Sequence, residues 1–522
     1  MAKQSLAYGT FILTMASLLN RVLGFVYQIV LVRLIHAEGI GLFSMVYPVY
    51  IMLLVLASAG IPVAIAKLVA EEMARKGPTG AYRIFRIGLS FIVFFAVLTT
   101  SALVLGGDGL LQRLFANPDV RMAFTVLIPG ILIVSVCSAF RGFFQGLQQM
   151  SPTALSQILE QCVRVAVGLG LAYWLLPYGV AYATAGASAG IVAGEAVGFA
   201  SMLAIYARKR PRVPRVGHRN GERLLTASRR IFSLAVPVTL TRFVSSGLMS
   251  LDAVLIPRRL VVAGLSTLEA TAVYGKLVGM AETLLFTPGI LTISLSTALV
   301  PAVAEARAQG NRRLMSQRVN NALKLTVLTG VPSAVIFLLV PSQLCSILYG
   351  YPDAGRILGA LALGGPFLYI VQTTTGILQG LGKAVEPFKN LLFASALKLT
   401  GIYYLTGLPE MGIIGTSLAL VSHFVLMAVL NTRDVVRITG VKINYSNTVL
   451  KPLFAGLVMA VAMALVLENG GPGAAAAAAA MAVGLSAYFL VAVITGAIER
   501  SHIERAVQLL IQASQPIRRF SR

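Results

Sequence analysis

Charged residues are scarce in this sequence. Asp, Glu, Lys and Arg make up only 12% of its 522 residues, whereas they make up about 25% of ordinary soluble domains. Hydrophobic residues account for 57% of the chain, and the mean hydropathy is +0.82. A water-soluble fold is therefore excluded, because too few polar side chains are available to cover the surface of such a protein.

Cysteines and catalytic signatures are also scarce. The three cysteines, Cys137, Cys162 and Cys345, lie in or near apolar segments and have neither metal-ligand spacing nor a disulfide pattern. The sequence contains no Gly-rich phosphate loop with its lysine, no His-Glu-x-x-His motif and no nucleophile elbow. These absences argue against an enzyme, against a cofactor and against direct use of ATP.

The sequence contains many long apolar runs. Runs of about 20 residues recur from end to end, and each can cross a hydrocarbon core of about 30 Å as a helix. They predict an all-α polytopic membrane protein with about fourteen transmembrane helices. The first run, 6–32, lacks a small-residue cleavage site and leads straight into the second, 40–66, so we expect a retained helix and not a signal peptide. A later span is expected at 272–301.

Basic residues outnumber acidic ones, 43 to 19, which gives a formal net charge of +24. Such a charge indicates either a nucleic-acid partner or the positive-inside rule of membrane proteins. Most of the basic residues fall in alternate loops, on one predicted side of the membrane. The richest loop, Arg208 to Arg230, has no aromatic interleaving and no recognition motif. We therefore expect both termini to be cytoplasmic and no nucleic-acid partner.

Two short motifs recur at one spacing. Val69-Ala70-Glu71 matches Val303-Ala304-Glu305, and Gln145-Gly146-Leu147 matches Gln379-Gly380-Leu381, each at an offset of 234 residues. Two matches at one offset, at corresponding ends of corresponding spans, indicate an internal duplication. The repeat unit holds six helices, so the halves share one orientation and are expected to flank a central cavity.

The duplication predicts five parts of the chain. Two six-helix lobes are joined by a basic linker, and two additional transmembrane helices and a basic tail follow the second lobe. The predicted bounds are 1–206 for the N-terminal lobe, 207–230 for the linker, 231–430 for the C-terminal lobe, 431–497 for the additional helices and 498–522 for the cytoplasmic tail.

Ionisable residues within membrane spans are costly, so by default they face a water-filled cavity or one another. Arginine can bind phosphate oxygens bidentately, which suits a cavity for an anionic, phosphate-bearing substrate. The candidate substrate-binding residues are Arg21, Arg164, Arg242 and Lys276. The candidate residues for proton or ion coupling, or for salt bridges, are Glu160, Glu195, Asp252 and Glu282.

The alternative for each of these residues is an internal ion pair. Glu160 and Arg164 stand at i and i+4, and this spacing favours a structural pair. Arg21 has no acidic residue within a helical turn, and Arg242 roughly mirrors it in the second half, so both are expected to face the cavity. The remaining acidic residues either relay a proton or hold a sodium ion, or else counter the basic side chains.

Five segments of the sequence are distinctive together: Asn20 to Phe25, Ala37 to Gly41, Tyr47 to Tyr50, Ala59 to Ala64, and Arg141 to Gly146. They resemble the polysaccharide-exporter family typified by stage V sporulation protein B, and the likeness covers nearly the whole chain. This family belongs to the multidrug/oligosaccharidyl-lipid/polysaccharide exporter superfamily and includes relatives of the lipid II flippases.

The resemblance implies two six-helix lobes around a cavity that alternates between the two faces of the bacterial cytoplasmic membrane. It implies flipping of an undecaprenyl-pyrophosphate-linked saccharide, such as lipid II, for cell-wall, spore-cortex or polysaccharide synthesis. The first cavity arginine of the lipid II flippases carries over to Arg21. Their other cavity arginines fall at Tyr27, near Leu54 and Val55, and at Glu282, so the match is partial.

The expected partners are a lipid-linked anionic saccharide and the phospholipid bilayer, with cell-wall synthesis enzymes as a further candidate class. Coupling to the membrane potential, to Na+ or to H+ would replace a cofactor. Two other functions stay open. One is a multidrug or organic-cation antiporter of the same superfamily, and the other is a non-transporting scaffold for a cell-wall synthesis complex.

Overall fold

A computed structural model describes residues 6–75, 77–209, 224–471 and 473–498. Every regular element within these residues is a helix. Most of the predicted basic linker and almost all of the predicted tail lie outside the described residues. The helices form two compact units: one takes in Met1–Gly279 and Thr406–Gly412, and the other takes in Met280–Leu405 and Ile413–Arg522.

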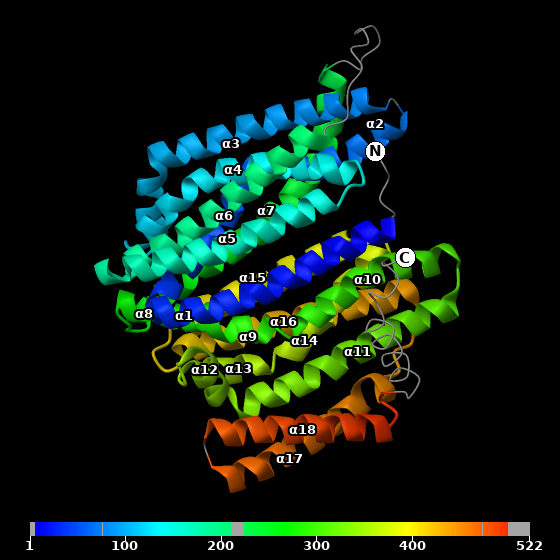
Figure 1. Cartoon of the computed structure of the whole chain (residues 1–522). Coiled ribbons are helices and arrows are strands. Elements are labelled where there is room, and N and C mark those ends of the chain that lie inside the picture. The colour runs from blue at the N-terminus through cyan, green and yellow to red at the C-terminus, as the bar shows by residue number, and fades with distance from the viewer. Residues whose placement is uncertain (1–5, 76, 210–223, 472, 499–522) are drawn as a thin grey trace, which may run out of the picture. The chain divides into compact units, whose positions relative to one another are not determined.

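The first unit contains the first eight α-helices, which Figure 1 shows from blue to green. They are α1 (Leu6–Ser58), α2 (Ile61–Arg75), α3 (Pro78–Leu114), α4 (Val120–Gly146), α5 (Ser151–Leu175), α6 (Val180–Lys209), α7 (Leu224–Val262) and α8 (Thr267–Gly275), with a 3-10 turn, η1 (Leu176–Tyr178), between α5 and α6.

The second unit contains ten further α-helices and a π-helical turn. They are α9 (Thr283–Phe286), α10 (Gly289–Ala308), α11 (Arg312–Leu339), α12 (Pro341–Tyr349), α13 (Ala354–Ala362), α14 (Gly365–Gly380), α15 (Val385–Leu405), α16 (Gly412–Thr439), η3 (Ser446–Leu450), α17 (Lys451–Gly470) and α18 (Ala474–Ile494). A second π-helical segment, η2 (Lys276–Glu282), joins α8 to α9, and the boundary between the units falls inside it, after Gly279.

Helix α1 holds both of the first two predicted spans. A helix of 53 residues would be about 80 Å long if straight, far more than a hydrocarbon core of about 30 Å. It is kinked at His36, whose backbone is not helical (φ 61°, ψ −179°). The second stretch then ends at Ser58, and two residues with positive φ, Ala59 and Gly60, separate it from α2. The predicted spans 6–32 and 40–66 are thus one kinked helix, and the second is eight residues shorter than expected.

The predicted count of about fourteen spans is not confirmed. The described residues contain 11 helices that are long and apolar enough to cross a membrane, or up to 12 if the bent pair α13 and α14 is one span. Part of the difference lies in α1, which counts as one helix. The expected span 272–301 is also divided among α8, η2, α9 and α10, because the backbone leaves the α-helix at Lys276 and breaks again before Gly289.

The 234-residue offset recurs in three-dimensional contacts. A Cβ atom added to Gly142 would lie 2.5 Å from the carbonyl oxygen of Pro62, and one added to Gly376 would lie 2.6 Å from that of Ser296. Gly146 and Gly380 face the carbonyls of Ala66 and Val300 in the same way, each at 2.7 Å. Both halves therefore pack their second and fourth helices through matching glycines. The lobe bounds themselves stay a prediction.

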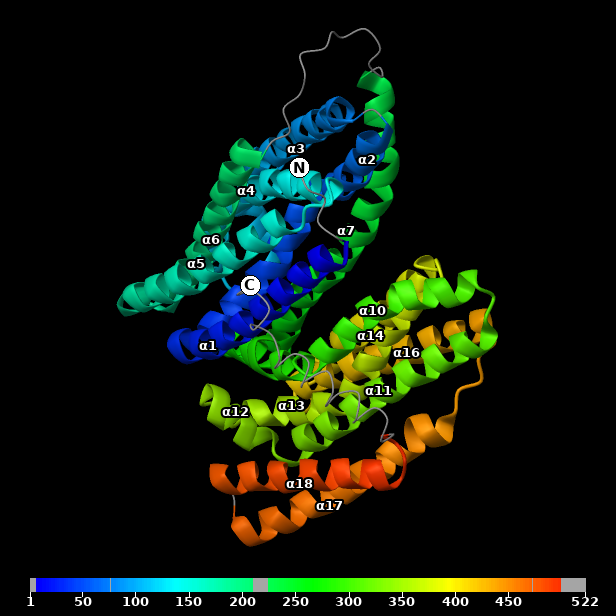
Figure 2. The same ribbon diagram turned by 45° about the vertical axis from the view of Figure 1, so that its right-hand side comes forward.

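Helix α7 begins the second half of the repeat but packs within the first compact unit (Figure 2). Its residues Ala227, Ile231 and Ala235 are buried in one apolar cluster with residues of α2, α3, α4 and α6. Arg230, beside them, binds Glu72 at 2.8 Å and Glu71 at 3.2 Å. The compact units and the sequence repeat are therefore two different divisions of the chain.

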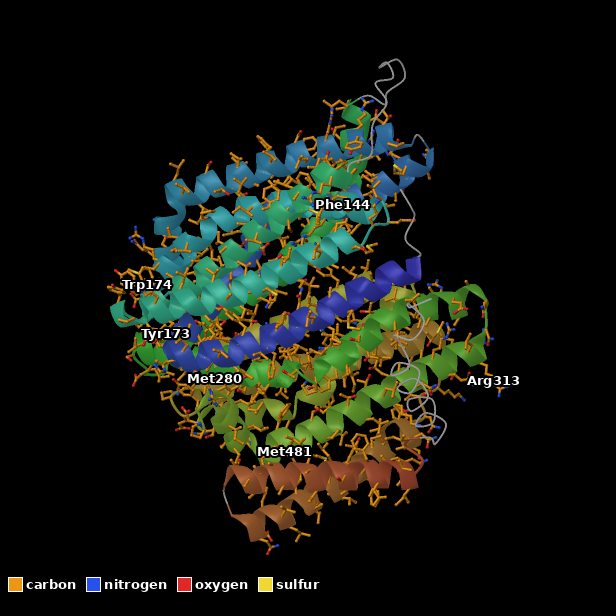
Figure 3. All side chains as sticks on the ribbon, viewed as in Figure 1. Phe144, Tyr173, Trp174, Met280, Arg313 and Met481 are labelled. Carbon is orange, nitrogen blue, oxygen red and sulfur yellow. The ribbon has the colours of Figure 1, made fainter. Side chains whose placement is uncertain are left out.

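Helices α17 and α18 pack against each other, with Gly484 of α18 directly over Met463 of α17. Their shared apolar cluster also includes Val327 and Val331 of α11. This cluster attaches the two additional helices to the second unit, and Figure 3 shows Met481 on the α18 side of the pair.

Candidate functional site in the first unit

Four glycines on α6 allow that helix to lie directly against α5. Gly186, Gly190, Gly194 and Gly198 follow one another at intervals of four residues, so they share one helix face. A Cβ atom at Gly186 would lie 2.8 Å from the carbonyl oxygen of Leu171, and one at Gly190 would overlap the backbone of Gly168. Such small-residue seams let helix backbones approach closely within membranes. The close approach places side chains of α5 and α6 within hydrogen-bonding distance.

The seam leads to a group of four charged side chains from three helices. Arg141 comes from α4, Glu160 and Arg164 from α5, and Glu195 from α6. Arg164 binds Glu160 at 2.6 Å and Glu195 at 3.1 Å, and Arg141 binds Glu160 at 2.8 Å. We call this group the charged cluster. Its two arginines and two glutamates balance when all four are ionised, as buried charges require.

The two glutamates of the cluster are not equivalent. Each carboxylate oxygen of Glu160 accepts a hydrogen bond from a different guanidinium, Oε2 from Arg141 and Oε1 from Arg164. Glu195 uses only Oε1, which binds Arg164, and its Oε2 is buried with no hydrogen-bond partner among the described residues. Buried polar atoms are almost always paired, so this orphaned oxygen needs an explanation.

Side chains of α1 carry further buried polar atoms without a partner among the described residues. The hydroxyls of Tyr27 and Tyr50 and the amide oxygen of Asn20 are buried without a hydrogen-bond partner in the described part of the chain. Tyr27 interacts electrostatically with Arg164, and Tyr50 with Glu195. The interior of the first unit is therefore polar where α1, α4, α5 and α6 meet.

Arg21 and Arg242 lie outside this cluster. Arg21 is half-buried on α1 and Arg242 is exposed on α7. Within the residues that the structure describes, neither guanidinium makes an ion pair or a hydrogen bond. Neither side chain therefore has a counter-anion in this part of the chain, and the predicted exposure of both to a central cavity stays a prediction.

Arg164, a predicted substrate-binding residue, is bound by carboxylates of the protein. The expected i, i+4 pair with Glu160 is present, and Glu195 adds a second carboxylate. Its guanidinium is therefore already engaged by protein anions, and only Nε lacks a partner among the described residues. The structure brings Arg164, Glu160 and Glu195 together and does not bring Arg21 or Arg242 into the same group.

The other predicted residues lie on α7 and η2. Asp252 is half-buried on α7, and Lys276 and Glu282 are the half-buried first and last residues of η2. All three take part in polar interactions. π-helical turns within α-helices are frequent at functional sites, which gives η2 interest beyond its charges.

The second unit has a polar group of a different kind. Asn390 of α15 donates hydrogen bonds to Asn431 at 2.9 Å and to Asp434 at 2.8 Å, both on α16. Asn431 in turn donates to Thr375 of α14 at 3.3 Å. Amides dominate this group, and its one carboxylate, Asp434, also pairs with Arg437 at 3.0 Å. No three His, Cys, Asp or Glu side chains gather as metal ligands within the described residues.

Arg141 and the α6 glycines were missed as site residues at the sequence level. Arg141 stands in the Arg141 to Gly146 stretch that carries the family resemblance, but its position near a span end hid its partnership with Glu160. The four-residue spacing of Gly186, Gly190, Gly194 and Gly198 was a readable signal of close helix packing.

This helical architecture defines a class. It is the fold of the multidrug and flippase transporters of the MOP superfamily. The solved structure of the lipid II flippase MurJ in an inward closed conformation aligns with a TM-score of 0.71 at 16% identity, and covers 93% of this chain and 98% of its own. An inward-facing multidrug transporter of the MATE family aligns with a TM-score of 0.67 at 15% identity, over 80% of this chain and 94% of its own.

Sequence comparison gives the family. The model for polysaccharide biosynthesis proteins matches residues 6–307, and the MatE model matches residues 260–403. Stage V sporulation protein B of Bacillus subtilis is 30% identical over 97% of this chain and 98% of its own length. The lipid II flippase MurJ of the same organism is 25% identical over 75% of each chain. The chain belongs to the polysaccharide biosynthesis protein family, and it is a multi-pass membrane transporter, not an enzyme.

Proposed function

We propose that this protein flips an undecaprenyl-pyrophosphate-linked saccharide, with lipid II as the first candidate, from the inner to the outer leaflet of the bacterial cytoplasmic membrane. Alternating access of a central cavity between the two lobes moves the headgroup. The product serves peptidoglycan synthesis in the cell wall or spore cortex, or polysaccharide synthesis. One relative is itself named a lipid II flippase, which supports the substrate class, and another is named a stage V sporulation protein, which supports a use in the spore cortex.

The proposal rests on the lack of a protein counter-anion at Arg21 and Arg242 in the described part of the chain. Both are arginines within apolar helices, and neither guanidinium has an anionic partner among the described residues. An unneutralised charge is costly within a membrane unless water or a ligand solvates it. A pyrophosphate presents several oxygens to which a guanidinium can bind bidentately. An anionic headgroup therefore suits these two residues, whereas an organic cation would require carboxylates and aromatic faces.

The rest of the scheme follows from this assignment. Both termini lie in the cytoplasm, as the distribution of basic residues predicts. Transport is driven by the membrane potential or by a gradient of Na+ or H+, because the sequence contains no ATP-binding loop. Lys276 and Arg164 are secondary candidates for contact with the headgroup, since both already interact with other protein groups.

Flipping of a fluorescent lipid II analogue in proteoliposomes tests the proposal. Wild type is compared with Arg21→Ala, Arg242→Ala and the control Arg313→Ala at equal reconstituted amounts. Arg313 is an exposed arginine at the start of α11 (Figure 3), so its loss removes one positive charge without touching the proposed path. Thermal unfolding in detergent establishes that each variant is folded.

We expect flipping by wild type and Arg313→Ala and its loss in the other two variants. Normal flipping by both Arg21→Ala and Arg242→Ala would remove these cations from the substrate path. A folded wild type that flips no lipid II analogue, with or without imposed gradients, would instead favour another lipid-linked glycan, the antiporter or the scaffold. Transport assays with organic cations and with other lipid-linked sugars separate these outcomes.

A further inference from the structure

The orphaned oxygen of Glu195 is the starting point of a more specific inference. Glu195 is 8% exposed, and its Oε2 has no hydrogen-bond donor among the described residues, although its Oε1 lies 3.1 Å from Arg164. A carboxylate oxygen that is both charged and unpaired in a buried site carries an uncompensated desolvation cost. Protonation at Oε2 removes the charge and converts the orphaned acceptor into a donor.

Glu160 cannot take this role as readily. Both of its oxygens accept charge-assisted hydrogen bonds, from Arg141 and from Arg164, so protonation would break one of them. Glu195 also interacts with the Glu160 carboxylate, and two carboxylates at close range disfavour double ionisation. A single proton at the cluster therefore goes to Glu195.

We propose that Glu195 is the proton-binding residue that couples flipping to the proton gradient, an inference that rests on the proposed function. The step is a reversible transfer of one proton from water to Oε2 of Glu195, without any change of oxidation state. It changes the net charge of the cluster from zero to +1. Of the coupling ions that the sequence leaves open, this assignment selects H+.

The groups that face Glu195 come from three helices. Arg141 and Cys137 lie on α4, Glu160 and Arg164 on α5, and Tyr47 and Tyr50 on α1. The hydroxyl of Tyr50 is buried and unpaired among the described residues, so it is the acceptor that we assign to the protonated carboxyl. Protonation also weakens the bond between Arg164 and Glu195, which is the only ion pair between α5 and α6 in the described part of the chain.

The helix that carries Arg164 lies beside the part of α1 that carries Arg21. Arg164 donates a hydrogen bond to Gln161 at 3.4 Å, and the amide nitrogen of Gln161 would lie 3.7 Å from a Cβ atom at Gly24. Gly24 stands one helical turn from Arg21 on α1, beside the buried amide of Asn20. An added positive charge at the cluster therefore favours an anion bound at Arg21, and by linkage the bound anion favours the proton.

Infrared difference spectroscopy of the purified full-length protein, titrated between about pH 5 and about pH 9, tests the assignment without any substrate. The carboxylic C=O stretch reports protonated side chains within this window. The variant is Glu195→Gln, and the matched control is Glu72→Gln, which removes a buried glutamate that binds Arg230 outside the cluster. Glu195→Asp keeps a titrating carboxyl if Glu195→Gln fails to fold.

We expect a titrating band in wild type and in Glu72→Gln, its loss in Glu195→Gln, and a shifted band in Glu195→Asp. A wild type without such a band overturns the inference, as does a band that persists in Glu195→Gln. In proteoliposomes, an imposed pH gradient should accelerate flipping by wild type but not by Glu195→Gln. Acceleration of both variants alike overturns the coupling role. Failure of the proposed function looks different, because the band would titrate while no lipid-linked saccharide is flipped.

Discussion

Arg164 of α5 and Glu195 of α6 form an ion pair of 3.1 Å across a seam of glycines. The two residues are 31 positions apart, and they meet because Gly190 and Gly194 leave no side chain between the helix backbones. The packing of α5 against α6 and the charge balance of the cluster therefore depend on the same pair of residues. A change that separates α5 from α6 must also disturb the charge balance of the cluster.

The glycine seam predicts opposite effects for two Gly→Ala changes. Within a helix, Ala is normally favoured over Gly by about 0.5–1 kcal/mol. At Gly170 an added Cβ meets nothing within 4 Å, so Gly170→Ala should leave stability unchanged or raise it. At Gly190 the added Cβ overlaps the backbone of Gly168, so Gly190→Ala should lower it. Thermal unfolding in detergent measures both, and equal stability of the two variants would contradict this packing.

Glu160 should be the most costly single deletion in the charged cluster. Removing one partner of a buried ion pair typically costs about 3–5 kcal/mol, because the other charge stays buried. Glu160→Ala leaves Arg141 without its carboxylate and Arg164 with Glu195 alone. Glu305, at the equivalent position to Glu71 in the repeat, pairs with Arg318, but its side chain is 56% exposed, so Glu305→Ala should cost about 0–1 kcal/mol. Similar unfolding temperatures for the two variants would argue against a buried cluster.

A positive charge without a guanidinium group should not fully restore the proposed transport function of Arg21. Lysine keeps the positive charge but cannot make the bidentate contact of a guanidinium with phosphate oxygens. We expect Arg21→Lys to flip lipid II at a rate between those of wild type and Arg21→Ala. Initial rates at several substrate densities in the vesicle membrane provide the measurement. A wild-type rate for Arg21→Lys would reduce the role of Arg21 to a point charge.

The start of α8 carries a pH-dependent helix cap. Ser266 donates hydrogen bonds from its hydroxyl (2.7 Å) and its backbone N–H (2.9 Å) to the Glu269 carboxylate, and these bonds hold the pKa of Glu269 below its usual range. A lowered pKa in the folded state means that the stabilisation is fully present above the unfolded pKa, about 4.3, and is lost as the pH falls through the lower folded value.

Amide exchange protection in the first turn of α8 checks this cap. Protection should be greater at neutral pH than below the folded pKa of Glu269, and Ser266→Ala should remove that difference. Protection in wild type that is the same on both sides of the transition would show that the capping box contributes nothing to the helix.

The sequence by itself determined the class of the protein. Its runs of apolar residues require membrane helices, because a chain with 12% charged residues has no other way to satisfy its backbone and hide its side chains. The 234-residue offset was readable in two tripeptides, and Gly146 and Gly380 turn out to make the same contact in each half. The pair Glu160–Arg164 was equally predictable, since i, i+4 spacing on one helix fixes proximity.

Only the tertiary structure decided which charges neutralise one another. Arg141, Glu160 and Glu195 lie on three different helices, and helical periodicity says nothing about which faces of separate helices meet. The same holds for α7, which the repeat assigns to the second half but whose buried residues pack into the first unit. Helix packing brings into contact residues that are far apart in the sequence, and these contacts include ion pairs. Arg164 is therefore bound by protein carboxylates, whereas Arg21, with the same side chain, makes no ion pair among the described residues.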